Sequence, residues 1–576
     1  MFLLVNSKCM MRNLDAASFC DRYSRAFVVL LLLLFFFHAV TQIPRKSLTV
    51  DEPANVAVGY AFLKTGDVNL GEDTPPLVRV ISALPLLALH PRLPLEDASW
   101  RDRIHWKFGN VFFDSNPPPL YFRMIFWSRV PMVLIACALG GWVYFVARRF
   151  FGSCAALVAL FLFTLEPNIL ANAMLVKNDL ASALVYLWFF YAAWLYLLSP
   201  DLRRALHVAA VLAIGMMTKF SLLLLFGLAG IVFITAFLLH RERRSSKPTI
   251  AHPTILKNHL MHGLAGAVLI IGIANLGYGL ELFRPHLSHV PLHSSVSRVL
   301  VHLLPITLLA GIESVFQVTG TGWPAFLAGH YSSTGWWYYY PLALAIKLPI
   351  PILVFFISGF VYGLYVVVRD RDWRWFLLLL AVVIYLVPSL GSKVNAGLRH
   401  ILPIFPPMCI LAGAMVARIL ERGRKPVKVA VAILLVALPI LVLRTYPDYL
   451  AYFNEIIGGP RNGWKYLSDS NLDWGEELPR LASYARENQI DDLKLAYLGG
   501  GNPEFYGMHA TMLEVPYAWE PHDLPPKMSP SSGTYAISVT LLQGTVFGDR
   551  RDYFQYFRDR EPMARLGESI FVFQVH

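Results

Sequence analysis

Cysteine and charged residues are both scarce in this sequence. It has five cysteines, which all lie in the N-terminal tail or in apolar runs, at Cys9, Cys20, Cys137, Cys154 and Cys409. A disulfide framework is therefore excluded for the polar C-terminal part. Charged residues make up 15% of the 576 residues, hydrophobic residues make up 56%, and the mean hydropathy is +0.50. Such a composition is typical of a multi-span membrane protein.

Internal repeats, low-complexity segments and a signal-peptide cleavage site are also missing. The net charge of +12 comes without the basic pattern of a nucleic-acid module, so no nucleic-acid partner is expected. The first apolar run, Ala26 to Ile43, follows several basic residues and precedes no small-x-small cleavage site. This pattern predicts a first transmembrane helix whose N-terminus lies in the cytoplasm.

The apolar runs predict about eleven transmembrane helices, each of about 20 residues. After the first run they lie near residues 124–147, 153–172, 178–198, 205–218, 221–239, 262–282, 340–368, 375–390, 400–419 and 427–443. The short basic clusters, at 148–149, 203–204, 241–244, 369–374 and 422–428, all fall on the cytoplasmic side of this topology. The same topology places Asp51, Asp179, Lys219, Arg399 and the tail after Arg444 outside the cytoplasm.

The sequence thus predicts a mainly α-helical, polytopic membrane bundle over residues 1–444, with surface helices in its first outer loop. An extracytoplasmic α/β domain follows over residues 445–576, which is long enough to bury its own core. A helix is expected there at Glu476 to Glu487, and strands are expected near 493–498, 535–539 and 570–575. Asp469 and Asp473 are expected to cap loops of this domain.

The first outer loop begins with Thr49-Val50-Asp51-Glu52-Pro53, where a membrane helix has ended and a new helix starts. Asp51 can cap that helix, and Gly66 ends it. One interpretation is a capped amphipathic helix on the bilayer surface. The other is that a carboxylate held at the membrane surface is a general base for a lipid-linked substrate. Pro75-Pro76 then starts a second, short apolar helix, Leu77 to Leu89, which is expected in the interface.

Several ionisable residues stand in or beside apolar runs, where they are costly unless they have a partner or a function. Arg129 either snorkels or binds a lipid phosphate. Asp179 either caps the helix that it opens or orients an acceptor. Lys219 interrupts an apolar stretch and suits a phosphate as a point charge. Lys347 is similarly isolated in a later span, and Arg399 suits a bidentate phosphate clamp.

The 283–339 loop is rich in histidine and ends in an aromatic cluster. His286, His289 and His293 have zinc-like spacing, but no cysteine or close carboxylate joins them, so a metal site is disfavoured. The cluster Gly335-Trp336-Trp337-Tyr338-Tyr339-Tyr340-Pro341 is usually an interfacial belt. Stacking on a sugar or gripping an isoprenoid is the alternative.

The order of these features resembles the GT-C glycosyltransferase superfamily. The resemblance is closest to the bacterial phospholipid-carrier-dependent glycosyltransferases of the protein O-mannosyltransferase and aminoarabinose-transferase group. The residues that carry it are Asp51-Glu52, Pro75-Pro76-Leu77, Arg129, the Pro167 to Asp179 segment, Thr218-Lys219, Gly335 to Pro341, Asn395 to Pro403 and Tyr449 to Gly475. The chain departs from the family pattern at Thr74, Asn172 and Lys177-Asn178, and these departures concern acceptor recognition more than the chemistry.

The resemblance implies an inverting transfer of a sugar from a polyprenyl-phosphate donor to an acceptor hydroxyl. Asp51 would be the catalytic base, with Glu52 beside it and Asp179 as the second acidic position. The expected phosphate-binding group is Arg129, Lys219, Arg399, His400 and Lys347, and the expected sugar or lipid contacts are Tyr60, Trp336, Trp337 and Tyr338. Asp51, Asp179, Lys219 and Arg399 are predicted to line one outward-facing cavity. A monophosphate leaving group demands no metal or other cofactor.

The expected partners are the lipid-linked donor, membrane lipids and an acceptor that is a protein, a lipid or a glycan. The expected location is the bacterial inner membrane, with the active site and the C-terminal domain on the periplasmic side. Two other classes stay open at this stage. The chain is alternatively a transporter or flippase for a polyprenyl-linked sugar, whose charges line a path, or a non-catalytic membrane scaffold.

Overall fold

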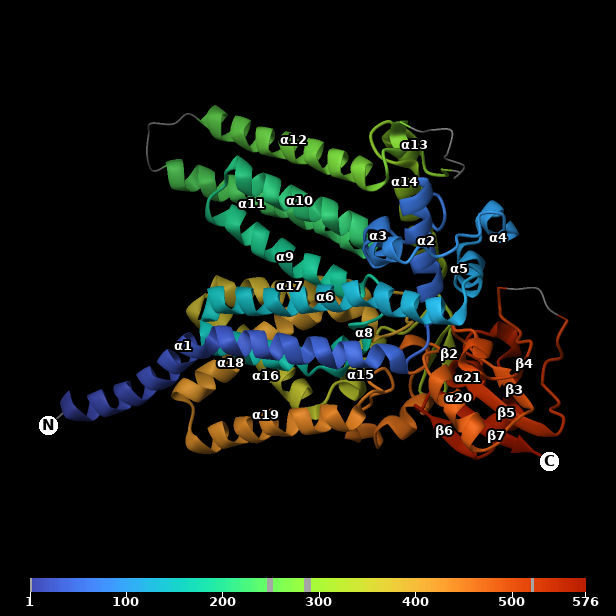
Figure 1. Cartoon of the computed structure of the whole chain (residues 1–576). Coiled ribbons are helices and arrows are strands. Elements are labelled where there is room, and N and C mark those ends of the chain that lie inside the picture. The colour runs from blue at the N-terminus through green and yellow to red at the C-terminus, as the bar shows by residue number, and fades with distance from the viewer. Residues whose placement is uncertain (1–2, 246–251, 284–291, 520–522) are drawn as a thin grey trace. The chain divides into compact units, whose positions relative to one another are not determined.

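The computed structural model describes residues 3–245, 252–283, 292–519 and 523–576, and it is mainly helical (Figure 1). Within these ranges, nine helices are long and apolar enough to cross a membrane. They are α1 (Leu3–Gln42) with η1 (Ile43–Arg45), α6 (Pro118–Phe151), α9 (Asp179–Leu198), η3 (Phe220–Leu223) with α11 (Leu224–Ser245), α12 (His252–Gly277), α16 (Ile350–Asp370), α17 (Trp373–Leu390), η6 (Leu398–Ile404) with α18 (Phe405–Arg422), and α19 (Lys425–Thr445). The predicted class, a polytopic helical membrane protein, is confirmed.

Two predicted spans form helices below spanning length. α7 (Ser153–Thr164) has 12 residues, because the chain leaves the helix at Leu165 and restarts as α8 (Pro167–Asn172) behind a cap from Glu166. α10 (Leu202–Thr218) has 17 residues, and its first turn is polar. The expectation of about eleven spans therefore becomes nine helices of spanning length among the described residues.

The chain forms two compact units, each built from separate segments. The first contains Met1–Pro53, Phe113–Leu175 and Val318–His576, and the second contains Ala54–Phe112 and Val176–Gln317. The boundary predicted between residues 444 and 445 stays a prediction. α2 (Glu52–Thr65), α5 (His105–Asp114) and α14 (Ile306–Thr321) each pass from one unit into the other.

Small residues allow close helix packing in the membrane part of the first unit. α7 packs against α1, α6 and α18, and α16 packs against α18. A Cβ on Gly413 of α18 would come within 2.4 Å of the Ala155 carbonyl oxygen, and a Cβ on Gly359 of α16 within 2.9 Å of the Ala412 backbone. Glycine at such contacts lets backbones approach, which is how helices gain packing energy in a bilayer.

The C-terminal part of the first unit contains a five-stranded mixed sheet of order β4-β3-β5-β7-β6 (Figure 1). The strands are β3 (Leu493–Ala496), β4 (Ala510–Met512), β5 (Gly533–Ser538), β6 (Ala564–Leu566) and β7 (Ile570–Val575). Leu495, Ala536 and Val572 lie opposite one another and pack with Leu481 of α20 (Leu478–Glu487), while Phe573 meets Phe557 of α22 (Gln555–Arg558). The three predicted strands and the predicted helix are confirmed in position.

The second unit packs α10 against α9 and α12, and α11 against the same two helices. Its core gathers Met217, Phe220, Ala274, Tyr278 and Leu308. The shorter elements of the chain are α3 (Pro76–Ala83), η2 (Leu84–Ala88), α4 (Ala98–Arg101), α13 (Ser295–Leu300), β1 (Ala325–Leu327), β2 (His330–Ser332), α15 (Tyr339–Lys347), η9 (Asp469–Asn471), η10 (Pro503–Tyr506) and α21 (Val539–Gln543).

The first outer loop differs from expectation in one respect. α2 is buried at every position from Glu52 to Ala61, so it is not a half-exposed amphipathic helix on a surface. Inside the second unit, its Gly59 lies against the backbone of α3, where an added Cβ would come within 2.1 Å of the Arg79 carbonyl oxygen. α2 is therefore a packed internal helix, and Gly66 ends it with φ +73° as predicted.

Candidate active site

A short extended segment, residues 46–50, leads from the first span to Asp51; we call it the 46–50 strap. Its backbone follows residues 474–476, with Ser47 N donating to Glu476 O (2.9 Å) and Val50 N donating to Trp474 O (3.1 Å). The Ser47 hydroxyl also donates to Gly475 O (2.8 Å). On the other side, Gly500 N donates to Leu48 O (3.2 Å). The backbone immediately before Asp51 is thus fixed on both edges by the C-terminal part of the chain.

Glu52, two residues after the strap, forms a buried ion pair with Arg129. Arg129 Nε and Nη2 donate to the two carboxylate oxygens of Glu52 at 2.9 and 2.6 Å, and both side chains have 0% exposure. Arg129 also donates to the carbonyls of Lys46 (2.8 Å), Ser47 (2.7 Å) and Ile43 (3.4 Å). A bidentate guanidinium pair is both strong and directional. Arg129 therefore holds the strap, and its donors are directed at the chain itself rather than at a lipid phosphate.

Thr49 makes a capping contact at the start of α2. Thr49 N and its hydroxyl donate to the Glu52 carboxylate at 2.9 and 3.1 Å, which is one half of a capping box. Asp51 is half-buried and directly precedes the helix. The Thr49–Glu52 contact thus supports the start of α2, and the cap expected from Asp51 stays a prediction.

Arg399 lies against the same tryptophan that holds the strap. Its guanidinium carbon is 4.4 Å from the centre of the buried Trp474 ring, and its Nε donates to the Ser470 hydroxyl (3.0 Å). Gly397, two residues before it, has φ +148° and packs on Ser470, where a Cβ would come within 2.2 Å of Oγ. Stacking and the Ser470 bond orient the planar guanidinium. His400, half-buried beside it, follows in η6.

Asn471 joins this region to the aromatic segment that ends the 283–339 loop. Its side chain accepts from Leu398 N (2.9 Å) and donates to the Tyr339 hydroxyl (2.9 Å). Lys347 is buried and donates to Asn471 O (2.5 Å) and Leu450 O (2.6 Å). Lys347 thus serves as an internal anchor for this loop. The first unit thus brings together four segments, near residues 50, 339–347, 399 and 470–474.

A charged network supports the strap from its first residue. Lys46 pairs with Glu477 and with Asp448 (2.7 Å), and Arg480 makes two further bonds to Asp448 (2.9 and 2.8 Å). Burial disfavours the charged form of Lys46, but Glu477 and Asp448 outweigh it and raise its pKa. Burial raises the pKa of neighbouring Glu476 to about 7, with Lys46 opposing the shift.

The second unit pairs two more of the predicted site residues. Lys219 Nζ lies 2.5 Å from Asp179 Oδ1, and the side chains of Lys219 and Asp179 are 14% and 1% exposed. Asp179 is the first residue of α9, and the preceding Asn178 donates to Thr218 O (3.1 Å). Lys219 is therefore partly neutralised by a carboxylate rather than standing alone as a point charge.

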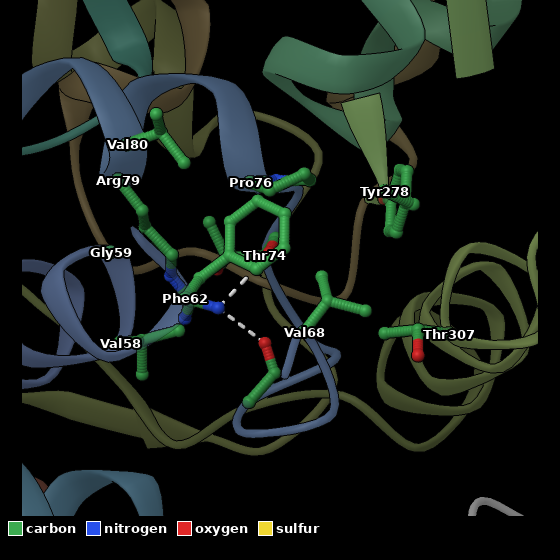
Figure 2. Close-up of a pocket in the computed structure, with 11 residues that line it drawn as sticks. Val58, Gly59, Phe62, Val68, Thr74, Pro76, Arg79, Val80, Tyr278 and Thr307 are labelled. Atoms are coloured by element: carbon green, nitrogen blue, oxygen red, sulfur yellow. Dashed lines mark hydrogen bonds between the residues drawn. The ribbon is translucent and has the colours of Figure 1, made fainter. Parts of the chain in front are cut away.

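A second polar cluster in this unit surrounds Arg79 of α3. Arg79 donates to Asn55 Oδ1 (3.0 Å), Thr74 O (3.0 Å), Gly71 O and Asp73 Oδ1 (3.2 Å). Burial favours protonated Asp73, but Arg79 and His105 outweigh it and lower the pKa of Asp73. Figure 2 shows Arg79 directed at the loop that contains Thr74, with Tyr278 and Thr307 across the pocket. This pocket has room for little more than one water molecule, so it holds neither a sugar nor a phosphate.

The predicted sugar or lipid contacts fall into two groups. Tyr60 is buried in the second unit, with its ring 5.5 Å from Phe112 and its hydroxyl donating to Pro91 O (3.4 Å). It is a packing residue there. Trp336 is half-buried and its backbone donates to Asn395 Oδ1 (2.7 Å), while Trp337 and Tyr338 are 68% and 42% exposed. Only the last two present large aromatic surfaces.

The part of the chain that the structure describes has no group of three His, Cys, Asp or Glu side chains that could hold a metal ion. Of the three histidines with zinc-like spacing, His286 and His289 lie outside the described residues. His293 is exposed and approaches Glu313 (3.5 Å). Asp473 caps a loop, as predicted, by accepting from Thr540 N (2.9 Å).

Sequence reasoning missed the support that Asp51 receives from far along the chain, through Ser470, Trp474, Glu476 and Glu477, and the part of Lys46 at the start of the strap. Local periodicity has no signal for such pairs, because the strap and residues 474–476 are separated by most of the chain. The run Tyr449 to Gly475 enters the sequence argument only through the family resemblance. The many polar and aromatic residues in this run are the one sequence feature that indicates a packed functional segment.

Comparison with known families gives one match within the chain. Residues 123–271, about a quarter of the sequence, match the family model described as dolichyl-phosphate-mannose-protein mannosyltransferase. The matched segment includes Arg129, Asp179 and Lys219. This match confirms the resemblance to GT-C membrane glycosyltransferases. No curated protein matches the sequence.

Two solved structures are similar to this chain. ArnT from Cupriavidus metallidurans bound to undecaprenyl phosphate is 12% identical, with a TM-score of 0.47 over 95% of this chain and 97% of that one. The apo oligosaccharyltransferase of Archaeoglobus fulgidus is 13% identical, with a TM-score of 0.42 over 80% of this chain and 58% of that one. With TM-scores below 0.5, these likenesses carry no residue role over to this chain.

Proposed function

We propose that this GT-C-type membrane glycosyltransferase moves a sugar from a polyprenyl-phosphate donor to an acceptor hydroxyl on the outer side of the membrane, with Asp51 as general base. The family match supports a lipid-phosphate-linked donor, since that family is described by such a substrate. The basic residues that precede the first span, among them Arg22 and Arg25, support an outer position for Asp51, which follows that span. A transfer rather than a transport function is favoured because no internal repeat accompanies the buried charges.

One observation carries the proposal. Asp51 stands between the strap, whose partner is Trp474, and the Glu52–Arg129 pair, and Arg399 lies over the same Trp474 ring. The residue before Asp51 and the Arg399 guanidinium thus both contact Trp474, within one unit. A base for the acceptor and a cation for the leaving phosphate are the two groups that this reaction requires.

In the proposed step, the Asp51 carboxylate takes the proton of the acceptor hydroxyl as its oxygen attacks the anomeric carbon. The bond between that carbon and the phosphate oxygen breaks, and its electron pair leaves with the polyprenyl phosphate. A single displacement inverts the configuration of the sugar. Arg399 neutralises the leaving phosphate with hydrogen bonds that strengthen as its charge develops.

Arg129 and Glu52 are assigned a positioning role, since their hydrogen bonds hold the strap and each other. Asp179 and Lys219 are the acidic and the basic group of the second unit. We assign them to the same reaction on the basis of the sequence resemblance. Trp337 and Tyr338 remain candidates for contact with the sugar or the isoprenoid.

The test is sugar transfer by purified protein in nanodiscs, with polyprenyl-phosphate-linked sugars as donors. Asp51→Asn is expected to lower turnover by about 10²–10⁴-fold, the usual contribution of a general base. Asp559→Asn, at an exposed position of the C-terminal domain, is the matched control and is expected to keep full turnover. Full turnover by Asp51→Asn, at an unchanged thermal midpoint, would remove Asp51 as the base.

A further inference from the structure

A pocket of about 390 Å³ opens beside the first turns of α6, on the first unit. Its lining includes Phe122, Arg123, Phe126 and Trp127 of α6 together with Pro44 and Tyr506. Its size lies in the range of ligand pockets, which are mostly apolar with a few placed polar groups. None of the residues assigned to the reaction lines it.

Arg123 is the charged group at this pocket that lacks a protein partner. It is exposed, and within the described ranges it makes no ion pair or side-chain hydrogen bond. Lys46, the other basic residue of the lining, is occupied by Glu477 and Asp448. Arg123 lies in the second turn of a membrane-spanning helix, where an unpaired guanidinium is costly unless it reaches an anion at the interface.

Aromatic side chains border the arginine. Phe122 and Trp127 are 39% and 42% exposed, and the Phe122 ring meets Tyr506 of η10 edge to face at 5.2 Å. Aromatic rings at the end of a span sit at head-group level, with the acyl region directly beside them. The pocket thus pairs a cation with an amphipathic rim at the depth of a lipid phosphate.

We propose that this pocket binds one anionic bilayer phospholipid. Its phosphate pairs with Arg123, and the first part of its acyl chains covers Phe122, Phe126 and Trp127. Charge complementarity selects this occupant, because anionic head groups attract basic residues beside a span. Ile43 and Lys46 also line the pocket, and their carbonyls accept hydrogen bonds from Arg129. The bound lipid therefore packs beside the 46–50 strap and stabilises it.

The experiment measures lipid retention by native mass spectrometry of the full chain. Protein is exchanged into phosphatidylcholine nanodiscs with or without phosphatidylglycerol. Wild-type protein is expected to retain one phosphatidylglycerol, and Arg123→Gln is expected to weaken retention by about fivefold, the contribution of one surface cation to anionic lipid binding. Arg148→Gln, at an exposed position near the other end of α6, is the matched control and is expected to retain the lipid.

A second readout uses the pocket's own tryptophan. Brominated phosphatidylglycerol is expected to quench wild-type fluorescence more than brominated phosphatidylcholine does, and Trp127→Phe is expected to abolish that difference. Arg123→Lys, which keeps the charge, is expected to keep most of the retention. Equal retention by wild type and Arg123→Gln at equal thermal midpoints overturns the proposal, as does equal retention of the zwitterionic lipid. Displacement of phosphatidylglycerol by stoichiometric polyprenyl phosphate also overturns it, since the pocket then belongs to the donor.

Discussion

The guanidinium of Arg129 meets the carboxylate of Glu52 through two hydrogen bonds of 2.9 and 2.6 Å, and neither side chain has any exposed surface. These two residues are 77 positions apart in the sequence. The pair joins the first residue of α2 to the interior of α6. Its effect is to make the backbone around Asp51 part of a rigid core rather than a mobile loop.

Removing one partner of this pair is predicted to destabilise the protein much more than removing both partners. Glu52→Leu or Arg129→Met alone leaves a buried charge without its partner and is expected to cost about 3–5 kcal/mol. The double variant is expected to recover much of that loss, which a denaturant titration in detergent measures as a coupling energy. Additive losses would mean that the two side chains act independently. If Arg129 instead binds the donor phosphate, Arg129→Met raises the donor KM at unchanged stability.

Arg399→Ala is predicted to reduce kcat/KM for the lipid-linked donor by about 10–100-fold, as the loss of one charge-assisted hydrogen-bonding group. Inhibition by free polyprenyl phosphate is expected to weaken in parallel, because the same guanidinium holds the product. Ser470→Ala removes only the partner of Arg399 Nε and is expected to give a smaller effect of the same kind. Unchanged product inhibition in Arg399→Ala would place the phosphate elsewhere.

Asp179 and Lys219 allow a test that separates structure from chemistry. Each single variant, Asp179→Asn or Lys219→Met, is predicted to lower both thermal midpoint and turnover, because a nearly buried charge loses its partner. The double variant is expected to recover the midpoint but not the turnover. Recovery of both would assign the pair a purely structural role.

The pH dependence of stability is predicted to involve Glu476. Its pKa is raised to about 7 from an ordinary value of 4.5, so the folded protein binds this proton more tightly than the unfolded chain. The contribution of Glu476 to the free energy of unfolding is largest below pH 4.5. It decreases as the pH rises from 4.5 to 7 and does not change further above pH 7. The whole effect is about 3 kcal/mol.

Glu476→Gln keeps an oxygen acceptor for Trp474 N and has no charge to bury. It is expected to raise the thermal midpoint at pH 8 and to flatten the decline between pH 4.5 and 7. Glu487→Gln, at an exposed position of α20, is the control and is expected to leave the profile unchanged. A profile for Glu476→Gln that matches the wild type contradicts the assignment.

The sequence predicted the helices and strands well where a local pattern specifies them. Apolar runs located the spans, and short strand-like runs located β3, β5 and β7. It was less successful where length or burial depends on neighbours. α7 and α10 are shorter than spans because polar residues limit them, and α2 is buried because Gly59 lets α3 approach.

For the candidate site, the sequence identified the ionisable residues but not their partners. Asp179 and Lys219 were both selected, and they pair. Arg129 was expected at a phosphate, yet it holds Glu52 and three backbone carbonyls, because a buried guanidinium must satisfy all its donors. The contact between Arg399 and Trp474 joins segments whose proximity no spacing rule encodes.

The 46–50 strap takes its hydrogen-bonding partners from residues that lie 428 positions later, as between Ser47 and Gly475. During synthesis, the ribosome completes every membrane helix before it reaches Trp474. The nascent chain therefore carries Asp51 beside an unfinished strap until synthesis has entered the last fifth or so of the polypeptide. We expect a chain that is cut short before Trp474 to lack the hydrogen-bonding partners of the 46–50 strap.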